Sequence, residues 1–169
     1  MKKYSINLRS VLFALQDFFM FTALNMVLLL VILYYLGTQE KEFINFLFLI
    51  FFSYYSIVAL IPVLFLFFNY EQNDAGNKIG LAKDFVMINS EEIKAVEIQE
   101  IIIYGAHHHF HRGYGLLPHA QDFFYMEIKL FDNRKYYITC LMSPEIDKEF
   151  KRELPYVKFI DRIKVFPKI

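Results

Sequence analysis

Two long apolar runs near the start of the chain constrain its fold more than any other feature. The runs cover Phe18–Leu36 and Phe43–Phe68, neither contains a charged residue, and six residues separate them. As helices they would span about 28 Å and about 39 Å, and the hydrocarbon core of a bilayer is about 30 Å thick. Because a backbone in hydrocarbon must satisfy its own hydrogen bonds, the sequence predicts a transmembrane helical hairpin over residues 18–69.

The residues before the hairpin predict its orientation. Lys2, Lys3 and Arg9 precede the first apolar run, and short cytoplasmic flanks of membrane helices carry an excess of basic residues. We therefore expect residues 1–17 to be a cytoplasmic segment, with two crossings that return the chain to the cytoplasm. A signal peptide fits poorly, because the apolar run is too long and no small-residue cleavage site follows it. The expected location is a bacterial-type inner membrane, with both termini cytoplasmic.

The charge of the rest of the chain argues against a nucleic-acid partner. Residues 70–169 carry fourteen Lys and Arg against fifteen Asp and Glu, a net charge of −1. Nucleic-acid binding and a polybasic patch for anionic lipid both require a basic excess, which this part of the chain lacks. Cys140 is the one cysteine, so no disulfide can form within the chain, which fits a reducing compartment.

After the hairpin, residues 70–77 read as a short polar linker, and residues 78–169 as a mostly β domain. Short strands are expected over Lys78–Lys83 and Phe85–Asn89. The next stretch, Ile93–Tyr104, is rich in β-formers and mostly alternates, which predicts a strand. An amphipathic helix over residues 91–100 is the competing interpretation.

The clearest β-hairpin lies in DFFYMEIKLFDNRKYYITCLM, residues 122–142. Apolar and polar side chains alternate in its first half, a tight turn surrounds Asn133, and a second strand returns. Ser143–Leu154 then predicts an amphipathic helix, because a capping serine and a proline precede apolar residues at every fourth position. Tyr156–Ile169 is either a last strand or a second short helix.

This late hairpin, the helix after it and the two membrane helices before it resemble bacterial membrane-anchored pleckstrin-homology-like proteins. The resemblance rests on residues 122–142 and on the order of elements along the whole chain. It implies a membrane-anchored α+β fold whose β domain is a half-open barrel closed by an amphipathic helix near the C-terminus. It also implies a binding or assembly module and names no ligand. Asn133 occupies the turn where the family often has glycine, and asparagine tolerates the left-handed conformation that such a turn needs.

All five histidines of the chain lie in residues 106–121. If this segment is extended, His107, His109 and His111 project from one face, about 6.6 Å apart. Imidazole suits Zn, Cu or Ni, and His119 could complete a site if the segment folds back. The alternatives are a solvated loop without a metal, and a surface whose charge changes with pH.

Two polar residues lie at the start of the first apolar run and within it. Asp17 is expected at its cytoplasmic edge, and Asn25 lies deeper, where polar groups are functional candidates. The simpler interpretation is that Asp17 reaches the interface and Asn25 bonds across to the second helix, at Ser53 or Ser56.

The sequence carries no phosphate-cradling glycine loop, nucleophile elbow or metalloprotease motif. Cys140 lies in a predicted strand and matches no redox motif, which is typical of a buried core thiol. We therefore predict a binding or assembly module without catalytic activity or a required cofactor, whose partner is another membrane protein or a second copy, with lipid contacts as an alternative. A metal or pH sensor that uses the histidines and a small transporter subunit are the alternative functions.

Overall fold

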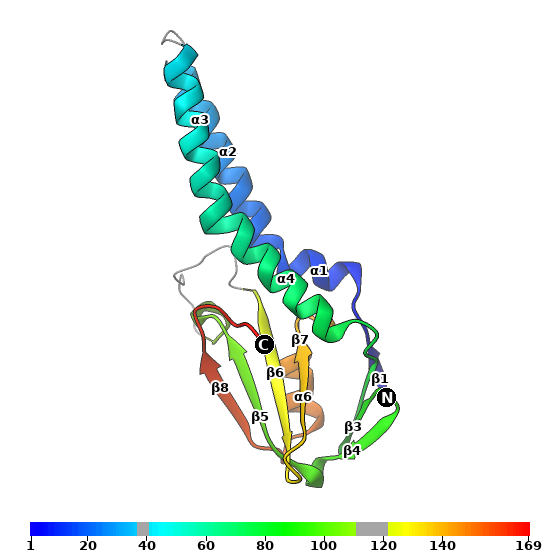
Figure 1. Cartoon of the computed structure of the whole chain (residues 1–169). Helices are drawn as coiled ribbons and strands as arrows, with labels where there is room; N and C mark the ends of the chain where they lie inside the picture. Colours follow the sequence, from blue (N-terminus) through cyan, green and yellow to red (C-terminus); the bar gives the residue numbers. More distant parts are fainter. Residues whose placement is uncertain (37–40, 111–121) are drawn as a thin grey trace.

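A computed structural model describes residues 1–36, 41–110 and 122–169. It shows an α+β protein in which a long helical hairpin projects from a domain of two β-sheets (Figure 1). The prediction of helices followed by a mostly β region is confirmed.

The hairpin consists of α2 (Gln16–Leu36), then α3 (Lys41–Tyr55) and α4 (Ile61–Asp74), with a π-helical turn over Ser56–Leu60 between the last two. Residues 16–35 and 43–74 are long and apolar enough to cross a membrane. The π-helical turn ends two residues before Pro62. Proline supplies no N–H for the carbonyl of the preceding turn, so the regular hydrogen-bond ladder cannot continue there.

The N-terminal segment, for which the sequence predicted no element, is folded into the domain. It forms β1 (Lys2–Tyr4) and α1 (Leu8–Ala14). Strand β1 pairs antiparallel with β2 (Ile79–Ala82), and Lys3 lies opposite Gly80. The side chain of Asn7 caps α1, because its Oδ1 accepts from the Ser10 N–H at 3.0 Å. The two ends of the hairpin therefore meet in one sheet.

Two four-stranded sheets build the domain. The first has the order β1-β2-β3-β4, and the second has the order β7-β6-β5-β8, in which β5 and β8 are parallel. The strands not yet given are β3 (Phe85–Ile88), β4 (Glu91–Lys94), β5 (Ile98–Gly105), β6 (Phe124–Leu130), β7 (Lys135–Thr139) and β8 (Phe159–Ile163). The predicted single strand over residues 93–104 is two strands, β4 and β5, which belong to different sheets and are separated by a 3₁₀ turn over Ala95–Glu97. The competing helix over residues 91–100 is wrong.

The late β-hairpin forms as predicted. Strands β6 and β7 pair antiparallel, with Met126 opposite Ile138. Asn133 adopts a φ of 69° in the turn between them, the left-handed conformation expected there. The strand interpretation of the C-terminal segment is also confirmed, since β8 follows α6 (Ile146–Glu153). Helix α6 is therefore not the last element, and it begins three residues after the predicted cap Ser143.

The predicted polar linker over residues 70–77 is wrong in its first half. Helix α4 continues to Asp74, and both Tyr70 and Asp74 are buried. The ring of Tyr70 packs against Phe123 and Tyr125, and its hydroxyl donates to the Pro167 carbonyl at 2.5 Å. These contacts stabilise the helix beyond the point where its sequence becomes polar.

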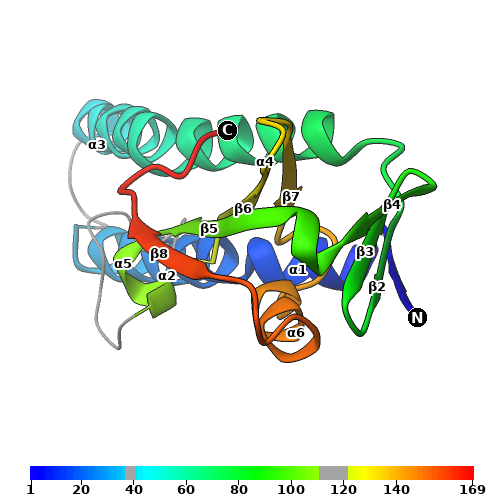
Figure 2. The same cartoon turned by 90° about the horizontal axis from the view of Figure 1, so that it is seen from below.

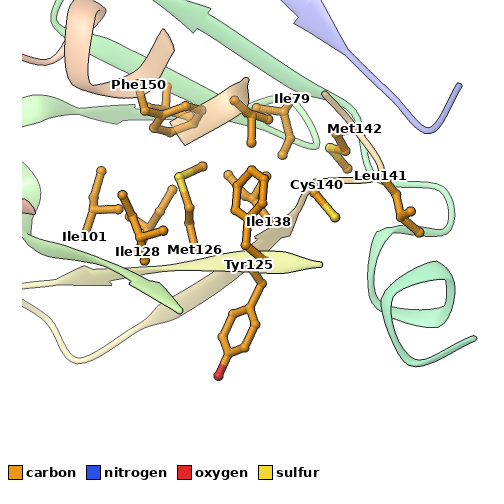
Figure 3. Close-up of a cluster of buried hydrophobic side chains, with 14 of the residues drawn as sticks. Ile79, Ile101, Tyr125, Met126, Ile128, Ile138, Cys140, Leu141, Met142 and Phe150 are labelled. Carbon is orange, nitrogen blue, oxygen red and sulfur yellow. The ribbon is translucent and has the colours of Figure 1, made fainter. Parts of the chain in front are cut away.

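The layers follow from these contacts. Figure 2 shows strands β5 and β6 between α4 on one side and α6 on the other. The main core lies on the α6 side, where Phe150 faces Ile101, Met126 and Ile128, whereas Tyr125 points to the opposite face (Figure 3). Helix α5 (His107–Phe110) is a single turn after β5.

Candidate functional site

A groove of about 1160 Å³ lies where the hairpin joins the domain. One wall is β1 and α1 with the first turn of α2, and the other wall is the loop between β7 and α6 with the first turn of α6. Asn7 fixes the two walls together, because its Nδ2 donates to the Met142 carbonyl at 3.1 Å. We call this cavity the α1–α6 groove. Figure 1 shows α1 lying crosswise at the base of the hairpin, which places the groove at that level.

The first wall of the α1–α6 groove is apolar and exposed. Leu12 is 50% exposed, Phe19 is 51% exposed and Met20 is 62% exposed, and Phe13 lies between them on the same wall. Phe19 and Met20 belong to the apolar span of α2. The apolar surface of the hairpin therefore continues without interruption into the groove.

The groove also carries charged side chains on β1, α1, α6 and the loop before α6, and most of them are paired. Glu149 accepts a hydrogen bond from the Tyr4 hydroxyl and lies 3.6 Å from the Lys2 ammonium, and Lys148 contacts Glu145 at 3.2 Å. Lys3 and Arg9 also line the groove, and neither has an ion pair among residues 1–36, 41–110 and 122–169. The groove therefore holds two uncompensated positive charges.

The structure describes only some of the candidate histidine side chains. His111 and His119 lie outside the described residues, as does the side chain of His107. Residues 107–110 form a helical turn, so the extended arrangement considered for this stretch is wrong. Within the described residues, no group of three or more His, Cys, Asp or Glu side chains is arranged to hold a metal. The four-histidine metal site stays a prediction.

His109 instead contacts a buried carboxylate on α6. Its Nε2 lies 3.3 Å from Oδ2 of Asp147, which is 6% exposed, and its ring stacks on Phe124 with centroids 4.1 Å apart. Burial raises the pKa of Asp147, but His109 and neighbouring groups, Lys151 among them, lower it by more, so this pKa lies below its usual value. The pair connects the segment after β5 to α6.

The two polar candidates of the first apolar run lie in α2. Asp17 lies in the first turn of α2, where a negative charge favours the positive end of the helix dipole. Asn25 donates through Nδ2 to the Phe21 carbonyl of its own helix at 2.7 Å. The predicted bond to Ser53 or Ser56 is absent from the described residues. The bond between the helices joins Thr22 and Tyr55, whose hydroxyls lie 2.5 Å apart.

A buried polar contact at the end of α4 was not predicted. Asp74 is 1% exposed, and its Oδ2 accepts from the Thr139 hydroxyl of β7 at 2.5 Å. Cys140, the next residue, is fully buried, and this burial raises the pKa of its thiol to about 12. A thiol with this pKa is protonated at neutral pH, which agrees with its expected role in the core.

The face of the second sheet opposite α6 carries a paired tyrosine cluster. The Lys164 ammonium lies 4.4 Å from the Tyr104 ring centroid and donates to the Tyr125 hydroxyl at 2.7 Å. Glu127 accepts from the Tyr104 hydroxyl at 3.0 Å and contacts Lys135 at 2.9 Å. Burial, with the charge of Glu127, raises the pKa of Tyr125 to about 12. Glu127 has an ion pair, and Lys164 is held by two rings and a hydroxyl, so the cluster stabilises the sheet.

Sequence analysis missed the α1–α6 groove because its walls are far apart in the chain. Lys3 and Arg9 are visible as basic residues, but they were interpreted as a topology signal only. The approach of Met142 and α6 depends on tertiary structure.

No family model matches the chain, and no curated protein matches it.

Proposed function

We propose that the protein is a non-catalytic binding or assembly module anchored in the inner membrane by its helical hairpin. The domain contacts another protein, or a second copy, at the cytoplasmic membrane surface. The observation that carries this proposal is the double attachment of the domain to the hairpin. Strand β1 precedes α2 and pairs with β2, and α4 continues into buried contacts with β7.

This double attachment keeps the domain close to the end of the hairpin. Only residues 75–78 separate α4 from β2, and extended residues reach at most about 3.6 Å each, so the domain stays close to the end of the hairpin. A linker of this length holds binding surfaces at a constant height above a membrane. A domain attached in this way suits assembly with other membrane proteins better than the binding of soluble proteins far from the membrane.

The orientation follows from the basic residues. Because β1 pairs with β2, the chain before the hairpin and the chain after it lie on the same side. Lys2, Lys3 and Arg9 favour the cytoplasmic side for this shared position. A pleckstrin-homology-like domain is the module that we propose, supported by the β6–β7 hairpin and by α6 packed on the sheets.

One contact favours pH-dependent binding as a second candidate function. His109 pairs with the buried Asp147, and Oδ1 of Asp147 has no hydrogen-bond partner among the described residues. Against the effect of burial, His109 holds the pKa of Asp147 below its usual value, so protonation of Asp147 at low pH would weaken this contact and the attachment of residues 107–110 to α6.

Cross-linking with mass spectrometry on the full-length chain in its native membrane tests the proposed function. We expect specific cross-links from the domain, or from the hairpin, to one membrane protein or to a second copy. A control chain with Leu28→Lys, which places a charge in the first apolar span, should lose membrane insertion and these cross-links together. Turnover of a substrate by the purified protein, abolished by substitutions of its histidines or aspartates, would contradict the proposal.

A further inference from the structure

We propose that the α1–α6 groove binds one anionic phospholipid from the leaflet at which the hairpin ends. Its acyl chain lies along Phe13, Phe19 and Met20, and its phosphate lies between Lys3 and Arg9. This inference rests on the membrane location in the proposed function and adds a ligand to it.

The apolar wall indicates where the ligand comes from. Exposed apolar side chains on a soluble surface are unfavourable by about 25 cal/mol for each Å² that contacts water. Leu12, Phe19 and Met20 are half exposed or more, and the latter two belong to a helix that is long and apolar enough to cross a membrane. An acyl chain that follows α2 can therefore enter the groove without crossing water.

The charges indicate which headgroup fits. The acidic residues that line the groove, Glu145 and Glu149, already contact Lys148, Lys2 and Tyr4. Lys3 and Arg9 have no such partner in the described part of the chain, so the groove attracts an anion. Arginine binds phosphate oxygens through a planar pair of N–H groups, and lysine adds a point charge.

The arrangement of the two walls favours a lipid over a peptide. The free cations lie on β1 and at the start of α1, and the apolar residues follow towards α2. Polar and apolar parts are thus separated along the groove in the same order as in a phospholipid at a membrane surface. The Asn7 bond to Met142 ties the two walls together, so the groove exists before the ligand arrives.

The absence of tryptophan from the chain allows a clean experiment. A single tryptophan placed by Phe13→Trp reports on the groove in full-length protein reconstituted in nanodiscs. The nanodiscs contain phosphatidylcholine with a minor fraction of phosphatidylglycerol, and only the phosphatidylglycerol carries brominated, quenching acyl chains. Met20→Trp serves as a second reporter if Phe13→Trp impairs folding, which labelling of the buried Cys140 monitors.

Two further reporters calibrate the signal. Leu28→Trp lies within the first apolar span and measures quenching by randomly mixed lipid. Phe131→Trp lies in the β6–β7 turn, at the end of the domain away from the hairpin (Figure 1), and should show no quenching.

We expect Phe13→Trp to be quenched more strongly than Leu28→Trp. Adding Lys3→Gln and Arg9→Gln should remove this excess and weaken phosphatidylglycerol binding at least fivefold, because each basic residue near an anionic surface strengthens binding about fivefold. The matched pair Lys78→Gln and Lys83→Gln, which lies outside the groove, should leave the excess unchanged.

Three results would overturn the inference, and they differ in what else they contradict. Quenching of Phe13→Trp at the level of Leu28→Trp, insensitive to Lys3 and Arg9, would show only the lipid annulus. If Leu28→Trp is quenched normally and Phe13→Trp is not quenched, the chain is inserted in the bilayer but the groove holds water or protein instead of lipid. No quenching of Leu28→Trp would mean that the hairpin is not in the bilayer, which contradicts the proposed function as well.

Discussion

The hairpin and the β domain place similar apolar residues in opposite surroundings. Both are rich in apolar side chains, but most of those on the hairpin are exposed, whereas Ile101, Met126, Ile128 and Phe150 in the domain are fully buried. In the domain, burial against other side chains provides the stability. On the hairpin, apolar character matches the proposed lipid surroundings, and few side chains pack together. The two regions should therefore respond differently to the same substitution.

The strongest test of this difference is the loss of a phenylalanine ring. Phe150→Ala removes a ring that is 0% exposed from the core, and should lower the free energy of unfolding by about 3–5 kcal/mol. Phe46→Ala, whose ring is exposed on α3, should lower it by less than about 0.5 kcal/mol. Thermal unfolding of detergent-solubilised protein, followed by a fluorogenic thiol reagent that reacts when Cys140 becomes exposed, measures both. Equal losses would show that the hairpin is packed as tightly as the core.

A threonine pair gives a second test, with a smaller effect. Thr139→Val removes the hydroxyl that donates to the buried Asp74, and should lower the free energy of unfolding by about 2 kcal/mol. Its counterpart in the hairpin is Thr22→Val, which removes the contact with Tyr55 and should lower it by about 0.6 kcal/mol. The same thiol assay compares them. If Thr22→Val has the larger effect, the junction at Asp74 is not what holds the domain to the hairpin.

The pair of His109 and Asp147 adds pH dependence to the domain. The pKa of Asp147 is lowered in the folded protein, so its stabilisation is present above about pH 4 and is lost as the pH falls through the lowered pKa. We expect His109→Ala to lower the free energy of unfolding by about 1.5 kcal/mol at pH 7 and by less at pH 3. The exposed Lys148→Gln is the control. A loss that is the same at both pH values would contradict the role of the carboxylate.

The smallest effect is expected for Asn25. Its amide donates to the carbonyl of Phe21 in the same helix and makes no bond to the second helix among the described residues. Asn25→Leu should therefore leave the unfolding temperature within about 1 °C of the parent chain, since the bond that is lost is local to one helix and leucine is similar in size. A marked loss of stability, or of oligomers in cross-linking, would show that the amide binds a partner within the membrane.

The same contrast explains what the sequence could predict. The hairpin is visible because its signal is a local run without charges, and β6 is visible because Phe124, Met126, Ile128 and Leu130 alternate with polar residues. The burial of Tyr125 and Glu127 on the other face of β6 was not visible. It depends on α4 and on the contact with Lys135, which lie elsewhere in the chain.

The candidate site shows this limit more clearly. Three residues of β1 are too few for a periodic pattern, and their partner strand begins beyond both apolar helices. Phe19 and Met20 could be recognised as apolar, but their position on a groove wall depends on the Asn7 contact with Met142. Sequence periodicity detects elements and not the meeting of elements that are distant in the chain.

The pairing of β1 with β2 has a consequence for synthesis. Lys2–Tyr4 are made before both apolar helices, whereas their partners Ile79–Leu81 emerge only after them. The first sheet therefore cannot be completed until the hairpin is in place and its two ends are on the same side. A chain inserted with one crossing would leave β1 without its partner and β2 with an open edge. In the membrane that we propose, completion of this sheet would thus depend on two crossings, and a chain with one crossing would keep an unpaired strand edge.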